Sequence, residues 1–124
     1  MTFEEFRAFV LSLPETVEAQ HHGSPDFRVR NKIMANLDET AGCITVKLSL
    51  SDQQALVQRG DGSFSLPGGW SKFGWTTIDL RTAAPDEIKE LIVDSWRRVA
   101  PRELWKQLAE HEVMDLSDDH PARP

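Results

Sequence analysis

The sequence predicts a single α+β domain that combines an antiparallel sheet with helices near both ends of the chain. Residues 26–50 alternate between apolar and polar side chains, which is the period of strands with one buried face. Apolar residues recur at helical spacing near the N-terminus and again after residue 85. The 124 residues are enough to bury about two-thirds of the unfolded chain's surface. One domain is therefore expected.

A helix is predicted to follow Thr2, because Thr2 and Glu5 have the spacing of a capping box. Pro14 should end this helix, since proline lacks the amide hydrogen that a helix interior needs. The helix would present one apolar stripe, made of Phe6, Phe9, Val10 and Leu13.

Residues 15–22 can form a short strand, in which Val17 and Ala19 would face the core. His21 and His22 are adjacent and would point to opposite faces of that strand, so they could not easily share a metal ion. The other histidines and the single cysteine lie at no established ligand spacing. We therefore expect no metal site and no cofactor.

Three strands are predicted to follow as a meander, over residues 26–30, 32–37 and 43–50. Asn31 and Lys32 lie at the first turn, and a polar connection over residues 38–42 forms the second. Strand alternation sends Arg28 and Lys47 outward and the apolar residues inward. Those inward residues are Phe27, Val29, Ile33, Ala35, Leu37, Ile44, Val46, Leu48 and Leu50.

The middle of the chain contains a predicted short helix and a glycine-rich aromatic stretch. Ser51 and Gln54 have capping-box spacing and should open a helix that reaches Arg59. A brief edge strand is possible over residues 63–66. Residues 68–74 should form a loop that carries large rings, because paired glycines admit unusual backbone angles. The next strand would point Thr76, Ile78 and Leu80 inward, and Trp75, Thr77 and Asp79 outward.

Pro85 suits the first position of a long C-terminal helix, in which apolar residues recur at spacings of three and four. Its stripe comprises Ile88, Leu91, Ile92, Ser95, Trp96 and Val99. A last helix is predicted after Pro101. We expect residues 1–110 to form the domain and residues 111–124 to form a polar tail.

The net charge of −6 counts against a nucleic-acid binder, since such domains are usually basic. The charge is uneven, however, because residues 24–80 carry six Lys/Arg and six Asp/Glu. The single cysteine fits a reducing compartment. Neither a secretory signal nor an apolar run of about 20 residues is visible. We therefore expect a soluble cytoplasmic protein without a membrane partner.

Four short patterns, taken in order, resemble the MmcQ/YjbR family of small bacterial proteins. They are Gly23-x-Pro25-x-Phe27-x-Val29-x-x-Lys32-Ile33, a strand with Lys47, Gly74-Trp75-Thr76-x-Ile78-x-Leu80, and Leu91-x-x-x-Ser95-Trp96. The resemblance covers residues 2–110. It implies an α+β fold with an N-terminal helix, an antiparallel sheet and C-terminal helices packed on one face. It also implies DNA binding through a double-wing arrangement of sheet and loops, and no catalytic set.

The candidate nucleic-acid site is the face of the sheet opposite the helices. Cations on such a face can contact phosphates, and a tryptophan can stack on a base. We expect the sheet to contribute Arg28, Arg30, Lys32, Lys47 and Trp75, and the adjacent loop to contribute Trp70 and Lys72. The plainer alternative is that these cations keep the sheet soluble and pair with Asp26 and Asp79.

Two other functions remain open. The protein could be a module that binds another protein or a small ligand, with an apolar or acidic partner held on the sheet face or between Trp70, Phe73 and the C-terminal helices. It could also be a weak homodimer that pairs through an open sheet edge, rather than a monomer. An enzyme is not expected, because no nucleophile elbow, phosphate loop or paired metal motif is present.

Overall fold

The computed structural model of the protein describes residues 1–21 and 23–108 and has the predicted α+β architecture. A single antiparallel sheet contains all six strands, in the order β1-β2-β3-β4-β6-β5. The elements in chain order are α1 (Phe3–Ser12), β1 (Thr16–His21), β2 (Ser24–Val29), β3 (Lys32–Asp38), β4 (Cys43–Lys47), α2 (Leu50–Gln58), β5 (Phe64–Ser65), the 3-10 turn η1 (Gly69–Phe73), β6 (Trp75–Asp79), α3 (Pro85–Val99) and η2 (Arg102–Leu104).

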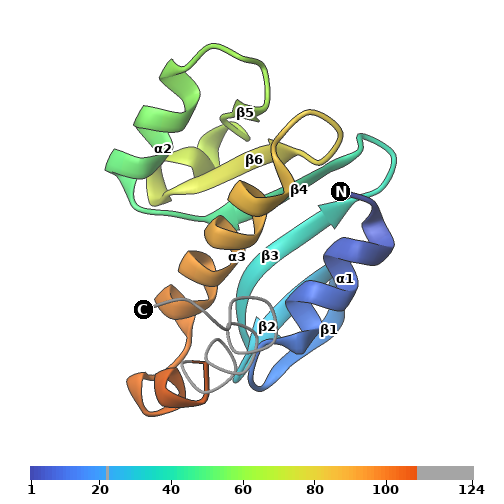
Figure 1. Ribbon diagram of the computed structural model, residues 1–124, viewed down its shortest axis with the longest axis vertical. Coiled ribbons are helices and arrows are strands. Elements are labelled where there is room, and N and C mark those ends of the chain that lie inside the picture. The colour runs from blue at the N-terminus through green and yellow to red at the C-terminus, as the bar shows by residue number, and fades with distance from the viewer. Residues whose placement is uncertain (22, 109–124) are drawn as a thin grey trace, which may run out of the picture.

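Helices α1 and α3 cover the same side of the sheet, as Figure 1 shows. Helix α2 lies at the β5 end and is joined to α3 by the ion pair between Arg59 and Glu87. We call the opposite side of the sheet the outer face. No helix of the described residues is long and apolar enough to cross a membrane.

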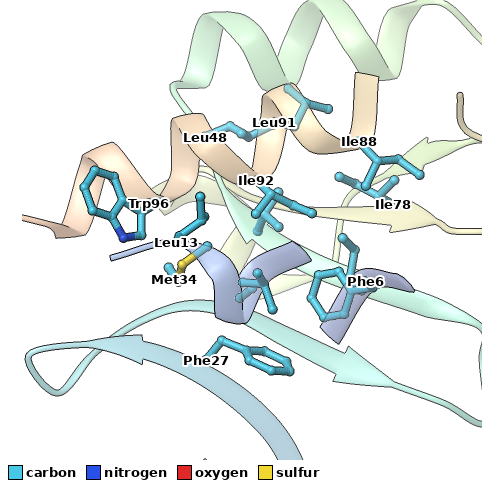
Figure 2. Close-up of a cluster of buried hydrophobic side chains, with 14 of the residues drawn as sticks. Phe6, Leu13, Phe27, Met34, Leu48, Ile78, Ile88, Leu91, Ile92 and Trp96 are labelled. Carbon is cyan, nitrogen blue, oxygen red and sulfur yellow. The ribbon is translucent and has the colours of Figure 1, made fainter. Parts of the chain in front are cut away.

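The core lies between the sheet and the two long helices (Figure 2). Phe6 of α1 meets Phe27 of β2 edge to face, with ring centroids 5.2 Å apart. Trp96 of α3 is fully buried, and its indole Nε1 donates to the Pro14 carbonyl at 3.0 Å. This bond ties the end of α3 to the segment that follows α1. Both helices thereby pack on the same apolar side of the strands.

Helices α1 and α2 each start at a residue whose side chain caps the helix, but the start of α2 differs from the prediction. Thr2 and Glu5 form the expected capping box, with two reciprocal bonds of 3.0 Å. Helix α2 is capped by Ser49, whose hydroxyl accepts from the amide of Asp52, and not by Ser51. Leu50 is therefore the first residue of a helix rather than an inward strand residue. Its side chain is 57% exposed.

Strand β3 contains a bulge that reverses one predicted side-chain direction. Phe27 pairs with Ala35 and Arg28 pairs with Ile33, so Met34 has no partner in β2. Met34 is buried in the core, whereas Ile33 shares the outer face with Arg28. The prediction that Ile33 faces the core is wrong for this reason. The Ser95 hydroxyl of α3 donates to the Met34 carbonyl at 2.6 Å and accepts from the Lys47 amide at 3.0 Å.

Strand β1 also has the opposite orientation to the one predicted. Thr16 is buried, and Val17 is 56% exposed on the outer face beside Arg28. Ala19 pairs with Asp26 on the same face. Since Val17 and Ala19 are the only apolar side chains in this strand, apolarity alone suggested an inward orientation. The register with β2 determines the actual one.

Candidate functional site

The outer face carries its side chains in transverse rows, because cross-strand partners share a face. Asp38, Cys43 and Asp79 form the row at one end, and two further rows lie beside it. One row runs from Val17 through Arg28 to Ile33, and Lys47 lies opposite Trp75 on β4 and β6. The other row is continuous across all six strands and consists of small or polar residues. Its members are Ala19, Asp26, Asn36, Thr45, Thr77 and Ser65.

Arg28 lies on the outer face as predicted, but its guanidinium is occupied. Nε and Nη2 donate to the two carboxylate oxygens of Asp26 at 2.8 and 3.0 Å. Nη1 donates to the side-chain oxygen of Asn31 at 3.0 Å. The hydrogen bonds to Asp26 raise the pKa of Arg28, and Asp26 itself is fully buried. Arg28 therefore compensates the buried negative charge of Asp26, as the plainer alternative predicted for this pair.

Arg30 and Lys32 do not lie on the outer face, so their predicted placement is wrong. Arg30 is in the left-handed β2–β3 turn, at φ 47°, and contacts Glu15 at 3.1 Å and Glu103 at 2.7 Å. Lys32 pairs with Val29, whose side chain is in the core. By strand alternation, the Lys32 side chain therefore lies on the side of the sheet that the helices cover, at the exposed start of β3.

Trp70, Lys72 and Phe73 project from the η1 turn between β5 and β6. Trp70 is 67% exposed and Phe73 is 54% exposed, and their rings lie 6.1 Å apart at a tilt of 49°. The Lys72 ammonium lies 5.2 Å from the centre of the Phe73 ring. The turn is predicted correctly as a loop that carries aromatic rings.

This turn is held in place by hydrogen bonds from α2 and from Leu48, which follows β4. The Gln53 amide of α2 is buried and donates to the carbonyls of Ser71 at 3.0 Å and Trp75 at 2.8 Å. The Leu48 amide donates to the Gly74 carbonyl at 2.9 Å. Gly74 has φ 95°, and a Cβ there would collide with the Leu48 carbonyl oxygen. The exposed rings are thus carried by a fixed backbone.

Exposed apolar side chains concentrate at this end of the molecule. Among the residues that the structure describes, six large apolar side chains are exposed, and four of them fall between residues 50 and 73. We call these four the aromatic-loop surface: Leu50, Leu66, Trp70 and Phe73. Leu50 starts the helix whose first turn holds η1, and Leu66 leads from β5 into η1. Neither leucine was predicted as a site residue, although Ser49-x-x-Asp52 signals the cap that exposes Leu50.

The seven predicted nucleic-acid residues thus separate into three groups. Lys47 and Trp75 are neighbours on the outer face, and Trp70 and Lys72 are in η1, which directly precedes Trp75. Arg28 is on the outer face but is bound to Asp26. Arg30 and Lys32 lie elsewhere.

Metal and thiol chemistry find little support in the described residues. Residues 1–21 and 23–108 contain no group of three or more His, Cys, Asp or Glu that could hold a metal ion. Cys43 is partly buried, and its thiol is 3.4 Å from the Ala41 carbonyl. Burial, reinforced by the nearby Asp79 carboxylate, raises the pKa of this thiol, which disfavours the reactive thiolate. His22 and the predicted tail at residues 111–124 lie outside the described residues.

Comparison with known proteins places this fold among others of the same kind. A family model described as YjbR matches residues 11–98. The crystal structure of Deinococcus radiodurans protein DR2400, described as a DUF419 domain, is 21% identical with a TM-score of 0.74 and covers 87% of this chain and 88% of its own. A crystal structure of a Pseudomonas syringae protein is 20% identical with a TM-score of 0.67, covering 81% of this chain and all of its own. No curated protein matches the chain.

Proposed function

Starting from the fact that this chain belongs to the YjbR family, we propose that it is a non-catalytic binding module that recognises a segment of another protein through the aromatic-loop surface. The single observation that carries this proposal is the exposure of Trp70 and Phe73 on a turn fixed by Gln53 and Gly74. Exposed apolar clusters mark interaction sites, and tryptophan is enriched among the residues that dominate binding energy. A fixed turn also lowers the entropy that binding costs.

The nature of the surface favours a polypeptide partner over a nucleic acid. Leu50 and Leu66 contribute aliphatic area, which suits apolar side chains and offers no ring for base stacking. The lysines at this end of the sheet are Lys72 in the turn and Lys47 opposite Trp75. Two cations give little of the electrostatic attraction on which nucleic-acid binding depends.

The buried polar side chains support a binding role rather than catalysis. Six of them lie among the described residues, and each has a structural partner. Ser95 bridges β3 and β4, Gln53 holds η1, and Asp26 binds Arg28. Thr16, Ser63 and Thr76 bond to Pro14, Thr82 and Gly74. Side chains that are buried and hydrogen-bonded within the fold are poorly placed to act as a nucleophile or a general base.

The proposal is tested by panning a phage-displayed random dodecapeptide library against the full chain. Peptides enriched on the wild type should bind the Trp70→Ser variant roughly thirty-fold more weakly, the effect of losing about 2 kcal/mol at a hot spot. Val17→Ser is the matched control, because Val17 is similarly exposed but lies on the opposite edge strand. Enriched peptides that bind Trp70→Ser as tightly as the wild type would contradict the proposal.

Duplex DNA is the second candidate, and the presence of Arg28, Lys47 and Trp75 on one face favours it. The slope of log K against log salt is about −0.9 per phosphate neutralised. Contact through Lys47 and Lys72 alone predicts a slope of about −2, which Lys47→Ala should reduce by about 1. A slope near −4.5 would require all five predicted cations to reach phosphates. That result would be inconsistent with the ion pairs that hold Arg28 and Arg30 within the fold.

A further inference from the structure

The charge around the aromatic-loop surface differs from that of the rest of the chain. The protein has a net charge of −6, yet residues 63–78 contain Lys72 and not one Asp or Glu. This stretch supplies β5, η1 and most of β6, and with them three of the four residues of the surface. This stretch therefore carries one positive charge and no negative charge, between Asp61 and Asp79 on either side of it.

The two lysines near the surface form no ion pairs within the described residues. All nine ion pairs of the described residues have an arginine as the cation, and neither Lys47 nor Lys72 takes part in one. Lys72 lies over the Phe73 ring, so its charge is presented next to the apolar area. Lys47 is opposite Trp75 on the outer face. Both charges remain available to a partner.

Asp52 is a carboxylate in the first turn of α2, the helix that starts at Leu50. Burial raises the pKa of Asp94 in α3, and the Asp52 carboxylate contributes to the same shift. The charge of Asp52 therefore acts on Asp94 of α3. It does not neutralise the lysines of η1 through any ion pair in the described part of the chain.

From this arrangement we infer that the partner segment is an acidic amphipathic peptide, with large apolar residues that cover Trp70 and Phe73 and carboxylates that reach Lys72 and Lys47. The inference rests on the proposed function and adds the chemistry of the partner. Complementary charges around an apolar centre set partner choice and orientation more than raw affinity. An apolar peptide without charge would gain from the rings alone, and a basic peptide would be repelled by the lysines.

The test takes the enriched dodecapeptides and compares their composition and their charge dependence. Asp and Glu should be enriched over Lys and Arg in the peptides that depend on Trp70. A synthetic peptide of this set should bind the full chain about three- to ten-fold more tightly than its counterpart with Asn and Gln in place of Asp and Glu. Lys72→Glu should weaken binding of the acidic peptide by a similar factor. Lys32→Glu, at the far side of the sheet, should change it less than about two-fold.

The outcomes separate this inference from the proposed function. Trp70-dependent peptides that are neutral or basic, or an unchanged affinity in Lys72→Glu, would overturn the acidic partner and leave a binding role for the surface. Peptides whose affinity is the same for the wild type and for Trp70→Ser would overturn the proposed function itself. An effect of Lys32→Glu equal to that of Lys72→Glu would show a general response to net charge and would also overturn the inference.

Discussion

The two ends of the sheet use the same kinds of residue in different ways. At the β1–β2 end, Arg28 and Arg30 are bound to Asp26, Glu15 and Glu103. At the β5–β6 end, Lys72 forms no ion pair within the described residues and lies beside exposed rings on a fixed turn. Arginines are bound to carboxylates at both ends, but the second end also presents lysine charge and exposed apolar area. Counting cations in a sequence therefore overstates how many can meet a ligand.

The largest expected effect comes from removing the cation at the structural end. Arg28→Ala should lower the free energy of unfolding by about 3–5 kcal/mol, because it leaves the buried Asp26 carboxylate uncompensated. Urea denaturation gives this number. The double variant Asp26→Ala, Arg28→Ala should recover part of the loss, since no lone buried charge remains. A single-variant loss below about 1 kcal/mol would show that the pair behaves as an ordinary surface contact.

A smaller but still large loss is expected at the base of the η1 turn. Gly74→Ala should cost roughly 2–4 kcal/mol, from left-handed strain together with collision with the Leu48 carbonyl. Gly68→Ala is the matched control, since Gly68 also has positive φ but has open space around it. It should cost only about 1–2 kcal/mol. Equal losses in thermal or urea unfolding would mean that the close approach does not anchor the turn.

Changes on the exposed rings should leave the fold intact. Trp70→Ser and Phe73→Ser should each change the free energy of unfolding by no more than about 0.5 kcal/mol, because both side chains are mostly in solvent. The same urea titrations measure this effect. A loss of several kcal/mol would place these rings among the residues that stabilise the domain and would remove the contrast between the two ends.

The smallest expected effect is a pH dependence at the structural end. Hydrogen bonds from Arg30 lower the pKa of Glu15 in the folded state. The contribution of Glu15 to stability is therefore complete above its unfolded pKa of about 4.3, and is lost as pH falls through the lower folded value. Glu15→Gln should accordingly be less stable than the wild type at pH 7. Thermal unfolding should show this difference vanishing in strong acid, and a difference that grows on acidification would contradict the assignment.

Much of the fold could be predicted from local patterns, because those patterns fix local structure. The Thr2 capping box, the Pro85 helix start and the alternation of β4 and β6 each depend on residues close in sequence. The bulge at Met34 could not be predicted in this way. Its free carbonyl is satisfied by Ser95, sixty-one residues further along the chain. One extra residue in β3 was enough to move Ile33 to the outer face.

The candidate site was predictable in its rings but not in its charges. Gly68, Gly69 and Gly74 signalled a loop, and the structure shows the aromatic turn there. Pairing of Arg28 with Asp26 was the plainer alternative from the sequence, because the two residues share one face of the strand, but the sequence did not show that Asp26 is fully buried. Leu50 was not predicted because the capping-box spacing indicated Ser51 as the cap, whereas Ser49 caps a helix that starts two residues earlier.

The most direct measurement of the central claim is a chemical-shift map of the ¹⁵N-labelled full chain titrated with an enriched dodecapeptide. The largest perturbations should fall on the Trp70 indole, on Lys72 and Phe73, and on the adjoining Trp75, while Arg28 and Arg30 stay unchanged. Perturbations centred on Arg28 and Val17, with η1 unaffected, would contradict the assignment of binding to the aromatic-loop surface.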